Sequence, residues 1–125
     1  MVFIGILLML NKINYLITEN IEPIIKDFHI DYYSGQHNWQ LVMYIPGEEK
    51  ENKLVGYLDY SEFKDQIYID MIKIEEEFQG LGYGKDLVRF LINKYSGKKI
   101  NWGLMTSDGF QLKKSLEKEG YKFNA

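Results

Sequence analysis

The chain has 125 residues, 46% hydrophobic and 26% charged, which fits one folded domain and excludes the disordered class. Its net charge of −3, without a clustered basic surface, argues against a nucleic-acid partner. The absence of cysteine excludes disulfides, thiolate metal sites and a cysteine-linked acyl-enzyme, and is consistent with a cytoplasmic location. Arg89 is the single arginine; with many Ile, Asn and Lys, this indicates AT-rich coding, as in some bacteria and phages.

Residues 1–10 are almost entirely apolar. The run is shorter than the about 20 residues that cross a bilayer, and it lacks the basic n-region and cleavage site of a signal peptide. No membrane partner is therefore expected. Two interpretations remain: an extended first strand, or a misassigned start codon with Met9 as the true first residue, which would leave residues 1–8 outside the native protein.

The first third of the chain predicts a strand, a helix and a loop. Residues 10–17 read as a strand. Asn20 or Glu22 is a candidate cap for a short helix that has Pro23 in its first turn and ends near Phe28. Residues 29–38 are polar and aromatic and predict a loop.

Three strands with tight turns follow, at residues 39–45, 54–60 and 67–74, and predict an antiparallel meander. In the third, the apolar residues occupy odd positions up to Met71 and then switch to Ile72 and Ile74. A side-chain period of two changes phase only if a residue is inserted, so we expect a β-bulge near Met71 and Ile72. The alternative is a strand buried on both faces.

A glycine-rich turn and a helix come next. The helix has one apolar face, formed by Leu87, Val88, Leu91, Ile92 and Tyr95, and ends at Gly97. Residues 100–105 predict a strand, a capping box at Asp108 and Gln111 opens a last helix that Gly120 closes, and residues 121–123 predict a short final strand. The expected fold is α+β, or mixed α/β, with about six strands in a mostly antiparallel sheet and about three helices.

The glycine-rich turn has the character of a phosphate site. Glycines let the backbone approach a ligand closely, and the first N–H groups of a helix are unpaired and lie at the positive end of its dipole. Three glycines alone are a weak signal, and their spacing matches neither a P-loop nor Gly-x-Gly-x-x-Gly.

What the turn does match is Gln/Arg-x-x-Gly-x-Gly/Ala, with Gln79, Gly82 and Gly84 at the three fixed positions. This pattern resembles the GNAT superfamily of N-acetyltransferases. Ile74 stands where the family has an aliphatic residue, Phe78 where it often has an aromatic one, and residues 118–121 are similar to its Lys-x-Gly-Phe ending. The resemblance extends over roughly residues 54–123 and implies one GNAT-like domain across residues 1–125, with the fourth and fifth strands splayed apart.

The resemblance also implies acetyl-CoA as co-substrate. Backbone groups of the bulged strand would bind the pantetheine arm as an added strand, and the turn would donate N–H groups to the pyrophosphate. The residues concerned are Ile72, Lys73 and Ile74 in the strand, Gln79, Gly80, Leu81, Gly82, Tyr83 and Gly84 in the turn, and Lys85 for added charge. The two scattered histidines, His29 and His37, do not predict a metal site.

Asp70 is the candidate general base, because it precedes the expected bulge and points away from the apolar set. Its alternative role is a polar residue on the solvent side of the strand. The family usually has a tyrosine that protonates the leaving thiolate four residues before the final glycine, where this chain has Leu116. Tyr121 is the candidate replacement, with Tyr83 also close in sequence, and a thiolate can also leave unassisted.

Two functions follow. The first is an N-acetyltransferase that moves the acetyl group from acetyl-CoA directly to an amine of a small molecule, a protein lysine or an N-terminus. The alternative is a catalytically weak or inactive GNAT-like module that binds acyl-CoA or another protein. The family usually has two helices after its first strand and a seventh strand, so the acceptor side here is minimal, open or completed by a partner subunit, as in a homodimer.

Overall fold

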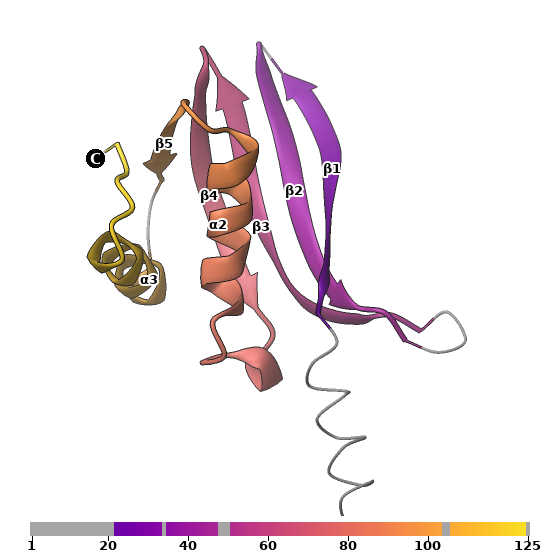
Figure 1. Ribbon diagram of the computed structural model, residues 1–125. Coiled ribbons are helices and arrows are strands. Elements are labelled where there is room, and N and C mark those ends of the chain that lie inside the picture. The colour runs from indigo at the N-terminus through magenta and orange to yellow at the C-terminus, as the bar shows by residue number, and fades with distance from the viewer. Residues whose placement is uncertain (1–21, 34, 48–50, 104–105, 125) are drawn as a thin grey trace, which may run out of the picture.

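The structure is a computed structural model that describes residues 22–33, 35–47, 51–103 and 106–124 (Figure 1). The predicted strand at residues 10–17 lies outside these ranges. The described elements, in chain order, are β1 (Ile24–Tyr33), β2 (Gln36–Ile45), β3 (Lys53–Phe63), β4 (Gln66–Ile74), the 3-10 helix η2 (Glu76–Phe78), α2 (Tyr83–Lys94), β5 (Lys99–Trp102) and α3 (Ser107–Lys118).

The strands form one sheet in the order β1-β2-β3-β4-β5. The first four are antiparallel neighbours, as the meander predicted, and β5 joins β4 in parallel after the crossover through α2. The α+β class is confirmed. The described ranges contain one five-stranded sheet and two α-helices. The expected sixth strand and third helix are not among the described elements.

Two predictions in the first third are wrong. The segment expected to be a helix up to Phe28 is strand β1, and the expected loop at 29–38 belongs mostly to the hairpin of β1 and β2. Cross-strand partners decide this, because His29 lies opposite Trp39 and Phe28 opposite Gln40. A short apolar run does not distinguish helix from strand by periodicity alone, and Pro23 fits the residue before a strand equally well.

The C-terminal part follows the prediction more closely. The helix after the glycine turn is confirmed as α2, and the last helix as α3. The capping assignment needs correction, because the hydroxyl of Thr106, not Asp108, accepts the N–H of Gly109 at 3.1 Å. Residues 121–124 form no strand, although the Asn124 N–H donates to Ile100 O at 2.8 Å.

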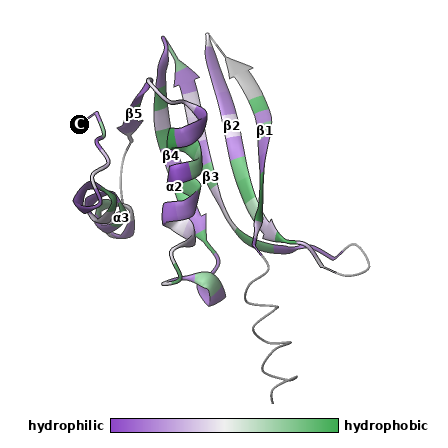
Figure 2. Ribbon diagram, in the orientation of Figure 1, coloured by the Kyte–Doolittle hydropathy of each residue, from purple (hydrophilic) through white to green (hydrophobic). Residues whose placement is uncertain are grey.

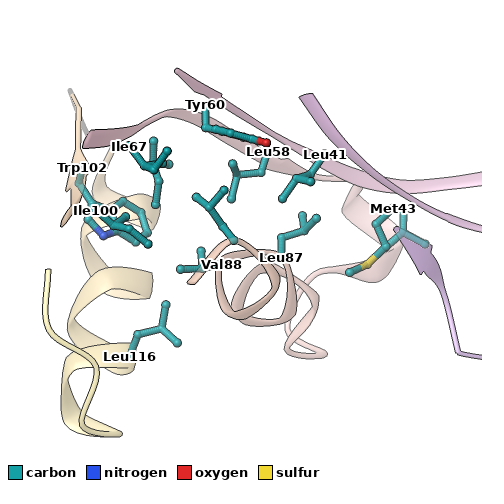
Figure 3. Close-up of a cluster of buried hydrophobic side chains, with 13 residues drawn as sticks. Leu41, Met43, Leu58, Tyr60, Ile67, Leu87, Val88, Ile100, Trp102 and Leu116 are labelled. Atoms are coloured by element: carbon teal, nitrogen blue, oxygen red, sulfur yellow. The ribbon is translucent and has the colours of Figure 1, made fainter. Parts of the chain in front are cut away.

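The core lies between the sheet and α2, with a contribution from α3 (Figure 3). Leu87, Val88 and Leu91 of α2 are fully buried, whereas the side of α2 turned away from the sheet is largely hydrophilic (Figure 2). The apolar face predicted for this helix is therefore the packing face. No helix in the described ranges is long and apolar enough to span a membrane.

Candidate functional site

The site begins with a β-bulge in β4. Tyr60 of β3 pairs with Ile69, and the preceding Asp59 pairs with Met71, so Asp70 is the extra residue. Before it, Ile69 is buried in the core; after it, Ile72 and Ile74 pack against the same core. This confirms the phase change predicted from the sequence and centres it one residue earlier, on Asp70.

Strands β4 and β5 part at the same level. Their register ends at Ile69 opposite Trp102, followed by a hydrogen bond from Gly103 N to Ile69 O at 2.9 Å. Beyond this point β4 pairs only with β3 among the described residues. Ile74 O accepts a hydrogen bond from the side-chain amide of Gln79 at 3.0 Å and not from a neighbouring strand. Ile72 lies two residues earlier, so its backbone N–H and C=O point to the same edge of β4. The edge of β4 is therefore open where the family resemblance required it.

A cleft of about 880 Å³ lies beside this open edge. Its walls contain every residue that the sequence assigned to the cofactor: Ile72, Lys73, Ile74, Gln79, Gly80, Leu81, Gly82, Tyr83, Gly84 and Lys85. Sequence reasoning missed the opposite wall, which consists of Thr106, Asp108, Gly109 and Leu112 at the start of α3. The signal available for it was the capping pattern, which already predicted a helix N-terminus at Asp108.

The turn before α2 depends on its glycines. Gly80 and Gly82 have φ of +78° and +88°, a region that favours glycine, and a Cβ at either would meet nothing within 4 Å. The first helical bond runs from Asp86 N to Gly82 O, so the N–H groups of Tyr83, Gly84 and Lys85 have no partner within the helix. The turn thus presents bare backbone to the cleft at the positive end of α2.

Gln79 uses its backbone N–H and its side chain for hydrogen bonds within the loop, so this N–H is not available to a ligand. Its backbone N–H donates to Glu76 O at 3.2 Å, and its side chain donates to Ile74 O. The ring of Phe78 contacts that of Tyr83 edge-on, with centroids 6.0 Å apart. These contacts tie the end of β4 to the start of α2 and so hold the turn in position.

The charged groups at the cleft are partly paired. Lys85 Nζ donates to Glu119 Oε2 at 2.5 Å, and Arg89, one turn further along α2, donates to Glu119 Oε1. Hydrogen bonds from Lys85, and then from Arg89, lower the pKa of Glu119. Lys73 and Asp108 are further charged residues in the cleft wall.

Asp70 belongs to a polar network on the sheet face opposite α2. Ser61 alternates with the core residue Tyr60, and its hydroxyl donates to Asp70 Oδ2. Gln36 Nε2 donates to Ser61 Oγ at 3.1 Å and to Asn38 Oδ1 at 2.9 Å. Desolvation raises the pKa of Asp70; the Ser61 hydrogen bond opposes this shift and the charge of Asp59 reinforces it.

The two catalytic candidates are not brought together. Hydrogen bonding to Glu119, and then to Tyr121, raises the pKa of Arg89, so Tyr121 lies beside α2. Tyr121 is absent from the cleft lining, whereas Tyr83 is part of it. Leu116 is fully buried in the core.

The histidines contact one another, with His29 Nε2 and His37 Nδ1 3.3 Å apart. Within the described ranges, no three His, Asp or Glu side chains cluster in a way that would hold a metal ion.

Comparisons with known proteins show which family the chain belongs to. No curated protein matches the chain. A solved structure, "The crystal structure of KacTA-DNA complex", is similar at 17% identity and a TM-score of 0.48, over 75% of this chain and 64% of that chain. This chain therefore spans less than two thirds of the length of the matched one. The model of the Acetyltransferase (GNAT) family matches residues 10–106, so the chain belongs to the GNAT family of acetyltransferases.

Proposed function

We propose that this protein binds acetyl-CoA in the cleft between β4 and the N-termini of α2 and α3, and transfers the acetyl group directly to an amine. One observation carries the proposal: the bare glycine turn and the stretch of β4 just after its bulge, where β4 has parted from β5, line one cleft. Membership of the GNAT family supports it, because that family uses acetyl-CoA.

The two ends of acetyl-CoA find different partners in this cleft. The pantetheine arm lies along the open edge of β4, where Ile72 offers its backbone N–H and C=O as a neighbouring strand would. The pyrophosphate lies at the turn, where the N–H groups from Gly80 to Lys85 and the dipole of α2 favour an anion. Lys73 and Lys85 add positive charge.

The transfer step needs a base near the bulge, and Asp70 has that position. Its raised pKa makes it a better proton acceptor than an ordinary carboxylate. The deprotonated amine nitrogen attacks the thioester carbonyl, the C–N bond forms and the C–S bond breaks. The thiolate of coenzyme A leaves without help from an acid, because it is much less basic than an alkoxide. It then takes a proton from solvent.

The acceptor approaches on the face that carries Asp70. Gln36, Asn38 and Ser61 add amide and hydroxyl groups there, which suit a polar amine. The proposed acceptor is a small molecule, a protein lysine or an N-terminus, met in the cytoplasm. Completion of this side by a second copy of the chain stays a prediction.

The binding half is tested by following the melting temperature during titration with acetyl-CoA. Saturation at about 100 times the Kd adds about 2.7 kcal/mol, or roughly 10 °C for a domain of this size. Gly82→Trp fills the open side of the turn and is expected to abolish that shift. Gly97→Trp is the matched control, because Gly97 has φ +89° and equally open surroundings but lies outside the cleft. Equal ligand shifts in both variants would refute the assignment of the turn.

The catalytic half is tested by mass spectrometry of candidate amines after incubation with acetyl-CoA. A mass gain of one acetyl group that needs Asp70 supports the transferase. Binding without any transfer, over a panel of polyamines, aminoglycosides and lysine peptides, would favour the alternative, a GNAT-like module that binds acyl-CoA without modifying an acceptor.

A further inference from the structure

We infer that Glu119 is an internal anion paired with Lys85 at the cleft, and that the phosphates of acetyl-CoA compete with it for that lysine. This inference rests on the proposed function, because it assumes that acetyl-CoA is the ligand. It assigns to Glu119, a residue outside the family motif of the turn, control over the affinity for the cofactor.

The contacts of Glu119 support this role. Its two carboxylate oxygens are divided between two cations of α2: Oε2 accepts from Lys85 at 2.5 Å, and Oε1 accepts from Arg89. Lys85 lies in the cleft wall, within the first turn of α2. The three side chains retain 28% to 34% of their solvent exposure, so the cluster is partly exposed and its strength is modest and depends on salt.

The balance of charges at the cleft supports a competition between Glu119 and the phosphates for Lys85. Lys73 and Lys85 are cations of the cleft wall, Asp108 is an anion of the same wall, and Glu119 is bonded to Lys85. Two positive charges thus face two negative ones before any ligand binds. Acetyl-CoA brings several negative charges on its phosphates, which Glu119 repels while it holds Lys85. Arg89 is bonded to Glu119 and also to Asp86 at 3.2 Å, so it does not replace Lys85 as a cation for the phosphates.

Glu119 also joins the end of α3 to α2, and the two roles predict effects of opposite sign. A purely structural Glu119 would, when neutralised, lower stability and weaken binding together. A competing Glu119 would, when neutralised, lower stability but strengthen binding. The sign of the change in affinity therefore separates the two roles.

The experiment measures the Kd for acetyl-CoA by calorimetry in the full chain and in Glu119→Gln. The expected result is binding about twofold to fivefold tighter in Glu119→Gln, the range for one partly exposed charge pair, with a smaller gain at high salt. Glu117→Gln is the matched control: Glu117 is exposed in the last turn of α3, two residues before Glu119, its loss changes the net charge equally, and it is outside the cleft lining.

A second pair of variants tests whether the effect passes through Lys85. Lys85→Gln is expected to weaken binding little in the wild-type background, where Glu119 occupies the lysine. The same change in the Glu119→Gln background is expected to weaken binding severalfold more, because Lys85 is then free to bind the phosphates. Equal losses in the two backgrounds would overturn the competition.

The outcomes also separate this inference from the function on which it rests. Wild-type protein that binds no acetyl-CoA refutes both. Wild-type protein that binds, with the same Kd in Glu119→Gln as in Glu117→Gln, refutes only the role of Glu119 and leaves the cleft as the cofactor site. Weaker binding in Glu119→Gln also refutes it, in favour of a structural bridge.

Discussion

Replacing Leu116 with tyrosine tests whether the missing acid of the family can be restored. The family resemblance puts the usual tyrosine at this position, so the sequence alone suggests that Leu116→Tyr would raise the rate. The structure predicts the opposite. Leu116 is fully buried and is not among the residues that line the cleft. Figure 3 shows it pointing from α3 toward Val88 of α2, within the core.

The cost follows from this burial. Tyrosine is larger than leucine, and overpacking a close-packed core costs about 1–3 kcal/mol. Its hydroxyl would enter an apolar cluster, and a buried hydroxyl without a partner costs about 1–3 kcal/mol more. The sum is about 2–6 kcal/mol, which for a domain of this size lowers the melting temperature by roughly 7–22 °C.

Thermal unfolding and acetyl transfer, measured on the same preparations, check this prediction. Leu112→Tyr is the control, because Leu112 lies on the same helix but lines the cleft and is only partly buried. We expect a large loss of stability in Leu116→Tyr, a small one in Leu112→Tyr, and no gain in rate from Leu116→Tyr. A Leu116→Tyr variant with wild-type stability and faster transfer would show that this side of α3 faces the substrate, and our assignment of its register would be wrong.

Three further predictions concern the paired strands β3 and β4. The raised pKa of Asp70 predicts that the rate rises with pH through a value above the ~3.9 of an exposed aspartate, and that Asp70→Asn removes this rise; a pH–rate profile that Asp70→Asn leaves unchanged would exclude Asp70 as the base. Because the fold favours protonated Asp70, stability falls as pH rises through this pKa, and Asp70→Asn should abolish that fall in denaturation curves. Gly56→Ala would press a Cβ against the backbone oxygen of Lys73, closer than Cβ atoms approach, so we expect a loss of about 1–3 kcal/mol in denaturant unfolding together with weaker acetyl-CoA binding; wild-type stability would mean that β3 and β4 are less closely packed there.

The sequence alone predicted the local structure around the glycine turn. Gln79, Gly82 and Gly84 identified the turn, the apolar face beginning at Leu87 identified the helix, and the phase change after Met71 identified the bulge. Each signal is contained in a few consecutive residues, because turn conformation, helix faces and strand phase are set by near neighbours in the chain.

Tertiary contacts decided the rest. The segment 24–33 became a strand because β2 offers it partners, which a short apolar pattern does not reveal. The second wall of the cleft, the burial of Leu116 and the meeting of Lys85 with Glu119 all depend on how α3 packs beside α2. Lys85 and Glu119 are 34 positions apart, so only the packing of the two helices determines whether they meet. Residues close in sequence therefore specified where the glycine turn proposed to bind the cofactor lies, and residues distant in sequence decided which charges and side chains face it.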